Sequence, residues 1–351
     1  MLHNAQNMDK HASRIPLVAA YSGTHFLVDF AGAFLMFRFI AGSPDAYLCV
    51  LLYNFCAFAM QMPLGIIADR LNRNYIFAMA GCLLVVASFG FIAFPVIAVV
   101  IIGIGNAMFH LGGGIDVLNI SDRKLGALGV FVSPGALGVY LGTIFGKGND
   151  LHAAFFPVAL IAAAALIFVI YKGQRGGYPK NPVFSLGGVR AGGAAIAIIC
   201  FFIVVCLRSY AGLNLDFTWK GEGYWGIALI CAVVLGKTIG GFAADRFGIK
   251  QTAVFSLGLA ALLFLFPLVA PAGTAALFLF NMTMPITLFA MARLFPCAKG
   301  FAFGILTFGL FLGFLPGYLG ASPPAGAGWL FTFLAAISLA LLFTGLRRAK
   351  L

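Results

Sequence analysis

Charged side chains are scarce in this sequence. Asp, Glu, Lys and Arg together make up 9% of the 351 residues, only 10 residues are acidic, and 62% are hydrophobic. A soluble protein with so few charges could not cover its surface with polar groups, so the composition excludes a soluble protein. It predicts instead an all-α polytopic membrane protein whose apolar helices cross the bilayer.

Two kinds of site are also missing from the sequence. The seven cysteines form no C-x-x-C pair and show no ligand spacing, so we expect neither disulfides nor a metal site. No Gly-x-x-x-x-Gly-Lys-Ser/Thr loop is present, which argues against a self-contained pump driven by ATP. The sequence therefore predicts no cofactor and no bound metal.

Positive charge is the exception to this scarcity, because 22 Lys and Arg give a net charge of +12. In a soluble protein that charge would indicate nucleic acid. Here the bases cluster in alternate loops, such as 70–73, 172–190 and 246–250. This is the positive-inside pattern, which predicts cytoplasmic termini, the inner (plasma) membrane and no nucleic-acid partner. The polar N-terminal region holds no cleavable apolar run, so the first helix is expected to insert without a signal peptide.

Apolar runs of about 20 residues, the length that spans a bilayer, divide the chain. The twelve candidate spans lie near 15–40, 46–67, 75–94, 96–119, 124–146, 151–171, 191–213, 221–244, 251–270, 273–292, 300–320 and 325–346. One sustained polar interval, rich in Gly and Pro, separates the sixth span from the seventh and indicates a flexible linker. The predicted parts are a cytoplasmic tail (1–14), a six-helix bundle (15–171), a cytoplasmic linker (172–190), a second six-helix bundle (191–346) and a cytoplasmic tail (347–351).

A short motif occurs twice, after the second and the eighth spans, 176 positions apart. Each copy has a glycine, an acid four residues later and an adjacent base. We interpret the copies as hinge loops, because glycine lets helices approach closely and Asp suits a helix terminus. The residues concerned are Gly65, Asp69, Arg70, Arg73, Gly241, Asp245 and Arg246.

A second internal repeat supports a duplication of six helices. The fifth and eleventh spans each carry G-x-x-x-G-x-x-x-G, at 138–146 and 309–317, offset by 171 positions. Four-residue spacing places these glycines on one helix face, where they allow close approach to a neighbouring helix. The same pattern at matching positions in both halves favours two pseudo-symmetric bundles.

Several ionisable residues fall inside the predicted spans. A charge at that depth costs ~2.5–3.5 kcal/mol on insertion scales, so each one is a functional candidate. In the first span, His25 and Asp29 lie one turn apart on one face, and we predict that Asp29 carries a coupled proton with His25 as relay or partner. The alternative is a hydrogen bond that only holds helices together.

The fourth span adds Asn106 and His110, which share a face, and Asp116 nearer the cytoplasmic end. We predict His110 as a further proton-coupling residue, and Asn106 and His110 as substrate contacts. Asp116 is equally well explained as a salt-bridge partner of Arg123 or Lys124.

The second half supplies polar groups of a different kind. Arg208 and Lys237 are bases inside the seventh and eighth spans, and each could either line a cavity or extend to the nearer interface. The predicted substrate-binding residues are Asn106, His110, Arg208, Tyr210, Lys237 and Asn281. The excess of bases over Asp29 favours an anionic or zwitterionic substrate.

These motifs resemble a known family. G-x-x-x-D-R-x-x-R at 65–73 and its echo at 241–250 are similar to the loop signatures of the major facilitator superfamily. The resemblance implies 12 helices in two six-helix bundles, a central substrate cavity and alternating access. T-H-F-L-V-D-F-A-G-A at 24–33 and G-I-G-N-A-M-F-H at 103–110 resemble the first and fourth helices of fosmidomycin-resistance-type exporters. That likeness implies transport roles for His25, Asp29 and His110.

The sequence thus predicts a secondary active transporter of a small organic solute, coupled to protons, with efflux favoured and no enzymatic activity. We expect a monomer in the lipid bilayer, with the solute and protons as its partners. A proton symporter or facilitator importing a small organic acid is an alternative. A membrane-embedded lipid-modifying enzyme is an alternative from a different functional class, although its catalytic groups would be expected near one interface. A scaffold or receptor that transports nothing is a third.

Overall fold

The computed structural model describes residues 15–121, 124–173, 186–321, 323 and 327–351. All regular structure in this part of the chain is helical. Among the described residues, eleven helices are long and apolar enough to cross a membrane, and Ile249–Leu263 is a shorter apolar helix. The structure confirms the all-α polytopic fold. The predicted tail 1–14 and residues 174–185 of the predicted linker lie outside the described residues.

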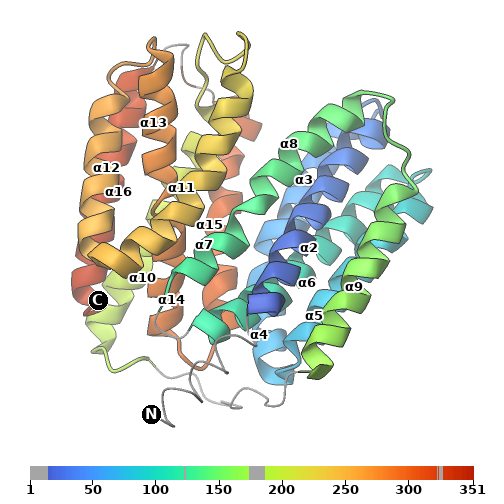
Figure 1. The fold of residues 1–351 in the computed structure, drawn as a ribbon, viewed down its shortest axis with the longest axis horizontal. Coiled ribbons are helices and arrows are strands. Elements are labelled where there is room, and N and C mark those ends of the chain that lie inside the picture. Colours follow the sequence, from blue (N-terminus) through green and yellow to red (C-terminus); the bar gives the residue numbers. More distant parts are fainter. Residues whose placement is uncertain (1–14, 122–123, 174–185, 322, 324–326) are drawn as a thin grey trace.

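The helices form two bundles (Figure 1). The elements of the first are α2 (Ile15–Leu35) with η1 (Met36–Ile40), α3 (Ala46–Asn54) with η2 (Phe55–Ala59) and α4 (Gln61–Leu71), α5 (Asn74–Ser88) with η3 (Phe89–Phe91), α6 (Pro95–Ser121), α7 (Gly126–Val132) with α8 (Pro134–Lys147), and α9 (Phe155–Gly173). The elements of the second are α10 (Ala191–Asn214), α11 (Trp225–Phe247), α12 (Ile249–Leu263), α13 (Ala270–Asn281) with α14 (Met284–Leu294), α15 (Lys299–Tyr318) and α16 (Gly328–Arg348).

The two glycine repeats pack equivalent helix pairs. A Cβ at Gly138 would meet the backbone of Phe26, so α8 lies directly against α2. A Cβ at Gly313 would meet the backbone of Cys206, so α15 lies in the same way against α10. This confirms the close approach that the four-residue spacing predicts.

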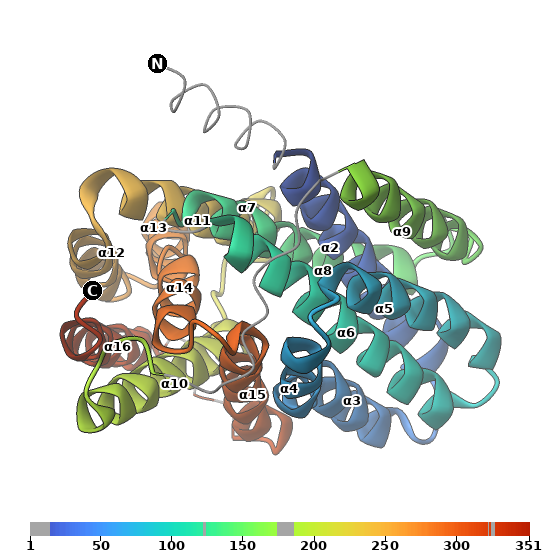
Figure 2. The ribbon, with the colours of Figure 1, turned by 90° about the horizontal axis from the view of Figure 1, so that it is seen from below.

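The two bundles are in contact at one end of the molecule. There α4 packs against α15, and α7 packs against α11 (Figure 2). The turns at this end carry basic residues, among them Arg73, Lys124 and Lys250, and we call it the basic end. Toward the opposite end, α8 and α11 diverge (Figure 1).

The seam between α3 and α15 is closed at the opposite end as well. The rings of Tyr47 and Tyr318 stack with centroids 4.2 Å apart. Each hydroxyl donates to the main-chain carbonyl of the other residue at 3.1 Å. One side of the bundle interface is therefore held at both ends, and the α7–α8 side only at the basic end.

Some predicted boundaries are wrong. The second span continues to Leu71 and the eighth to Phe247, so Asp69, Arg70, Asp245 and Arg246 lie in the last helical turns and not in loops. Hydropathy ends a span at its first charge, whereas helical hydrogen bonding continues into the interface, here as far as the left-handed Asn72 (φ 49°). The ninth span is also too long, because α12 ends at Leu263, shortly before Pro267, and proline disfavours helix at the residue preceding it.

Candidate functional site

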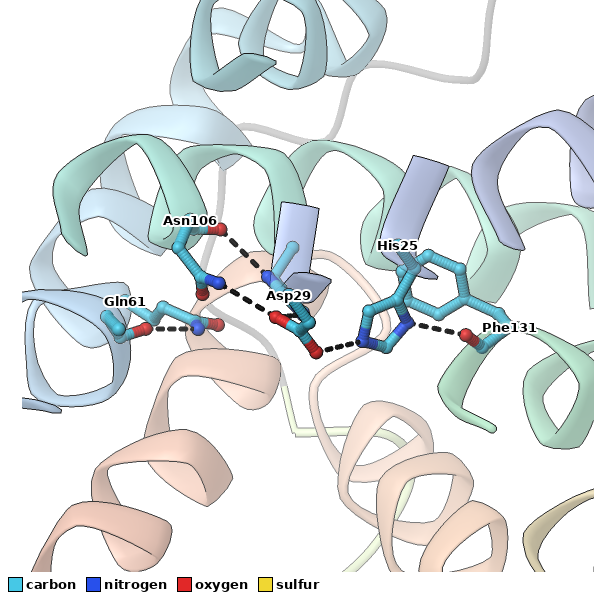
Figure 3. A network of polar contacts seen from close by, with 7 residues as sticks. His25, Asp29, Gln61, Asn106 and Phe131 are labelled. Atoms are coloured by element: carbon cyan, nitrogen blue, oxygen red, sulfur yellow. Dashed lines mark hydrogen bonds and ion pairs between the residues drawn. The ribbon is translucent and has the colours of Figure 1, made fainter. Parts of the chain in front are cut away.

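Asp29 is the centre of a buried polar cluster in the first bundle (Figure 3). Its Oδ1 accepts a hydrogen bond from Asn106 Nδ2 at 2.9 Å. Its Oδ2 lies 3.2 Å from His25 Nε2, and its Oδ1 lies 3.7 Å from His110 Nε2. The two imidazole rings meet edge to face with centroids 4.4 Å apart. Residues four apart on α2 and on α6 therefore converge on one carboxyl group. The sequence predicts the shared face within each pair but not the contact between the pairs.

Main-chain carbonyl groups orient both imidazoles. His25 Nδ1 lies 2.6 Å from the carbonyl oxygen of Phe131, and His110 Nδ1 lies 2.8 Å from that of Asn106. A carbonyl oxygen can only accept, so each Nδ1 must carry the proton. A neutral ring then presents a bare Nε2 to Asp29. The His25–Asp29 contact is a hydrogen bond only if a further proton lies on one of the two groups.

A break between α7 and α8 makes room for this cluster. Pro134 begins α8, and a Cβ at Gly135 would overlap both Asp29 Oδ2 and His25 Nε2. Ser133 hydroxyl lies 2.7 Å from the Thr238 hydroxyl of α11, so the break is also hydrogen-bonded to the second bundle. The Ser-Pro-Gly sequence thus positions the cluster beside the bundle interface.

A cavity of about 300 Å³ lies in the second bundle, between the C-terminal half of α10, the loop that follows it, and helices α11 and α13. Its polar lining residues are Arg208 of α10, Lys220 of the following loop, Lys237 of α11 and Asn281 of α13. The structure therefore brings together three of the predicted substrate-binding residues, Arg208, Lys237 and Asn281. Arg208 and Lys237 both line the cavity, which favours this interpretation over the alternative that each side chain extends to the nearer interface.

Arg208 is 9% exposed and has no carboxylate partner among the described residues. Its Nη2 donates to Thr287 Oγ1 at 3.2 Å, and its Nη1 is buried without a hydrogen-bond partner. Arginine retains its charge in proteins, so this buried guanidinium lacks a compensating anion. The group is suited to hold an anion.

Tyr210 does not line this cavity, contrary to the prediction. Positions 208, 211, 212 and 215 of α10 do line it, and these follow the helical period. Tyr210 is rotated about 200° from Arg208 around a helix of 3.6 residues per turn, so its side chain packs against the core.

The cavity and the Asp29 cluster interact across the bundle interface. The Lys237 ammonium is within electrostatic range of Asp29 and of His110 in the first bundle, and of Arg208 in its own. Lys237 makes no ion pair within 4.0 Å among the described residues. The polar groups of the two bundles therefore form one electrostatic unit at the interface.

The repeated motif residues join the bundles at the basic end. Asp69 of α4 accepts from the main-chain N–H groups of Gly300 and Phe301, at 2.8 and 2.9 Å, where α15 begins. Gly65, one turn earlier, allows this approach, since a Cβ there would overlap Gly300. An anion at a helix N-terminus is favourable because the first N–H groups lack helical partners.

The second copy makes the same contact in the reverse direction. Asp245 of α11 accepts from the N–H groups of Leu125 and Gly126, at 2.7 and 2.8 Å, where α7 begins. Gly241 lies against the carbonyl oxygen of Leu125. Each aspartate thus binds the opposite bundle, while the remaining residues of the motif, Arg70, Arg73 and Arg246, are exposed.

Among the described residues, Asp116 makes no salt bridge, including none with Lys124, one of the two partners considered from the sequence. Its carboxylate is 1% exposed and accepts from Tyr21 Oη at 2.7 Å and Asn74 Nδ2 at 2.8 Å. Lys124 makes no ion pair with it, and Arg123 lies outside the described residues. Asp116 therefore joins α2, α5 and α6 within the first bundle.

His25, Asp29 and His110 also meet the spacing of a metal site, with ligand atoms within 4.8 Å of one another. Asp29 already accepts a hydrogen bond from Asn106, and the Lys237 ammonium nearby would repel a divalent cation at this position.

Sequence reasoning missed several residues of the site. Gln61, drawn with Asn106 and Asp29 in Figure 3, is 1% exposed, and its Oε1 has no hydrogen-bond partner among the described residues. Tyr53 interacts electrostatically with Asp29, and its hydroxyl lies against Gly32. A polar residue within the apolar run 46–67 is a signal that could have identified both. Thr287 carried no comparable signal.

No protein-family model matches the sequence, and no curated protein matches it. Solved structures do. The crystal structure of the E. coli fucose:proton symporter is similar with a TM-score of 0.65 at 14% identity, over 96% of this chain and 99% of that one. The human organic anion transporter MFSD10 has a TM-score of 0.66 at 16% identity, over 95% and 99%. A bacterial homologue of the iron transporter ferroportin, in its outward-facing state, has a TM-score of 0.62 at 11% identity, over 95% and 98%.

The chain has the fold of the major facilitator superfamily transporters, as the motif resemblance implies. The similar structures named above are those of transporters.

Proposed function

We propose that the protein is a secondary transporter of a small organic anion or zwitterion, coupled to protons, that works by alternating access. The fold supports a secondary transporter. The observation that carries the proposal is the pairing across the interface of a buried carboxyl–imidazole cluster with an uncompensated cationic cavity. A symporter of fucose and protons and an organic anion transporter share this fold.

The Asp29 cluster is suited to carry the proton. Both Nδ1 atoms are committed to carbonyl groups, so a mobile proton has Asp29 and the two Nε2 atoms as its sites. Asp29 is 15% exposed at its side chain, close to the bundle interface. A change of access at this interface would expose the cluster to water on one side and then on the other.

The proposal is tested by transport in sealed vesicles with an imposed pH gradient, across a panel of organic anions. We expect at least one anion to accumulate when the gradient is present and to equilibrate without accumulation when it is absent. A protein that moves no solute of the panel under either condition would contradict the proposal.

The contacts at the basic end support alternating access, because they close this end while α8 and α11 diverge at the other. Asp69→Asn replaces a carboxylate by an amide, which can accept at only one of its two atoms. Hydrogen bonds to charged groups contribute ~1.5–3 kcal/mol, so we expect about a tenfold or greater shift toward a form open at the basic end. Solute exchange should slow, with little change in solute affinity, since Asp69 lies far from the cavity.

Distances between spin labels on α4 and α15 at the basic end measure this shift. Asp245→Asn should act in the same direction through α7, and Asp45→Asn, whose side chain caps no helix, is the matched control. A large loss of equilibrium solute binding in Asp69→Asn, with normal exchange, would contradict the assignment.

The cluster is proposed to hold protons and not a metal ion, and this can be tested by metal removal. We expect EDTA treatment of the purified protein to leave its transport rate unchanged after reconstitution. Metal content of the purified protein is the control. A loss of transport restored by one divalent ion would identify His25, Asp29 and His110 as its ligands.

We propose the orientation from the positive-inside pattern: the basic end and both termini face the cytoplasm. The membrane is proposed to be the inner (plasma) membrane. We further propose that residues 172–190 link bundles formed by 15–171 and 191–346, that the protein is a monomer, and that export is the favoured direction. Import of a small organic acid is the alternative direction.

Topology can be tested by labelling. Cysteines introduced at positions 5 and 180 are expected to resist a membrane-impermeant thiol reagent added outside intact cells, and to react in lysed cells. A cysteine at the exposed position 220 serves as the external control. Reaction at position 5 or 180 from outside would reverse the orientation.

A further inference from the structure

The cavity of the second bundle has two chemically distinct parts. Its cationic part consists of Arg208 and Lys237, with Asn281 beside them. The remaining lining is formed by apolar side chains and glycine, apart from Lys220 in the loop at the outer rim. The apolar wall includes Leu215, Leu229, Ile230, Val233, Leu277 and Phe280.

The hydrogen bonds and ion pairs already made within the cavity leave few polar atoms available to bind a ligand. Asn281 Nδ2 donates to the carbonyl oxygen of Leu277 at 2.9 Å. Lys220 is exposed and lies 4.0 Å from Asp216. Arg208, by contrast, is nine-tenths buried, and its Nη1 has no hydrogen-bond partner in the part of the chain that the structure describes. The strongest unmet demand in the cavity is therefore for acceptor oxygens with negative charge at Arg208.

We propose that this cavity binds an amphiphilic organic anion, whose charged head lies between Arg208 and Lys237 and whose apolar body lies along the Leu, Ile and Phe wall. The inference rests on the proposed transport function and specifies its substrate class. A carboxylate, sulfonate or phosphate head offers two acceptor oxygens to the planar guanidinium, which pairs with such groups bidentately.

Other solute classes fit the lining less well. A sugar carries hydroxyl groups around its ring, and the apolar wall would bury them without hydrogen-bond partners, at a cost in free energy. An organic cation would meet three bases and no carboxylate among the residues that line this cavity. A small inorganic anion would satisfy Arg208 but would leave the apolar wall in contact with water.

Matched six-carbon probes test the proposal through ligand-induced thermal stabilisation of the full-length protein in detergent. A ligand that binds the folded protein stabilises it in proportion to RT ln(1 + [L]/Kd). We expect hexanesulfonate and hexanoate to stabilise it, and hexan-1-ol, hexylammonium, methanesulfonate and fucose to stabilise it far less. Hexyl phosphate and dodecyl phosphate, compared in the same way, distinguish a small solute from a single-chain lipid as the source of the anion.

Variants locate the head group. Arg208→Gln should weaken hexanesulfonate binding about 10- to 100-fold, and Lys237→Gln should act in the same direction, because each loses a charge-assisted hydrogen bond. Arg208→Lys keeps the charge without the fork and should give an intermediate loss. Lys147→Gln, which removes an exposed base of α8 that does not line the cavity, is the matched control and should bind nearly as the parent does.

Equal stabilisation by hexan-1-ol or hexylammonium would overturn the anionic head, and equal stabilisation by methanesulfonate would overturn the apolar body. Unchanged hexanesulfonate binding in Arg208→Gln, or no stabilisation by any six-carbon anion, would overturn the site. Counterflow of another solute class in proteoliposomes would show that the transport function stands while the substrate class is wrong. Absence of counterflow for every class would remove both.

Discussion

Asp29→Asn is expected to abolish the accumulation of solute against a gradient while sparing its movement down a gradient. The amide has the shape of the neutral acid but cannot release a proton. A gradient of about one pH unit is worth ~1.4 kcal/mol, which corresponds to about tenfold accumulation for 1:1 coupling, and all of this should be lost. Uptake driven by a pH gradient and exchange at equilibrium, measured in the same proteoliposomes, separate the two effects.

His25→Ala is the companion variant. His25 contacts one oxygen of Asp29, and His110 faces the other, so loss of His25 leaves a second imidazole beside the carboxyl group. We therefore expect weakened coupling and a shifted pH optimum, without complete loss. Full gradient-driven transport by Asp29→Asn would show that the proton is carried elsewhere, with His110 the next candidate.

Gly135→Ala is the second change with a large expected effect. A Cβ at this position would overlap Asp29 and His25 together, and Gly135 lies directly after the proline that begins α8, so the backbone there is constrained. Overpacking of this kind costs ~1–3 kcal/mol. If this strain is relieved by moving the cluster out of place, the same free energy corresponds to about a 5- to 150-fold loss in coupled transport.

The control for Gly135→Ala is Gly23→Ala on α2, the helix that carries His25 and Asp29. A Cβ there would meet nothing within 4 Å, and Gly23 is exposed. Gly23→Ala should leave coupled transport unchanged. If Gly135→Ala folded normally and transported as the parent does, the cluster would not depend on the close contact with α8.

Much of the arrangement could be predicted from local sequence patterns. The i, i+4 pairs His25–Asp29 and Asn106–His110 each occupy one helix face, and the glycine repeats mark where helices touch. These features depend only on helical periodicity, which can be read from the spacing of residues in the sequence. The same periodicity, applied to α10, would have excluded Tyr210 from the cavity face that includes Arg208.

Other features depend on contacts between bundles and could not be predicted in this way. The sequence places Asp69 and Asp245 near helix ends but does not say that each aspartate binds the first turn of a helix in the opposite bundle. Tyr53 becomes relevant only because its hydroxyl reaches Gly32 on the helix that carries Asp29, and Gln61 only because α4 packs against α6, the helix that carries Asn106. Main-chain carbonyl groups fix the imidazole tautomers. Every residue has such a group, so the residue type at these positions does not indicate this role.

The most direct test of the central claim is a measurement of proton movement caused by the solute. Proteoliposomes with a pH-sensitive dye inside are given an external organic anion in the absence of any imposed gradient. The account predicts a change in internal pH with the parent protein and none with Asp29→Asn, although the labelled anion crosses the membrane in both. Equal pH changes in the two proteins, or anion movement by the parent protein without any pH change, would contradict it.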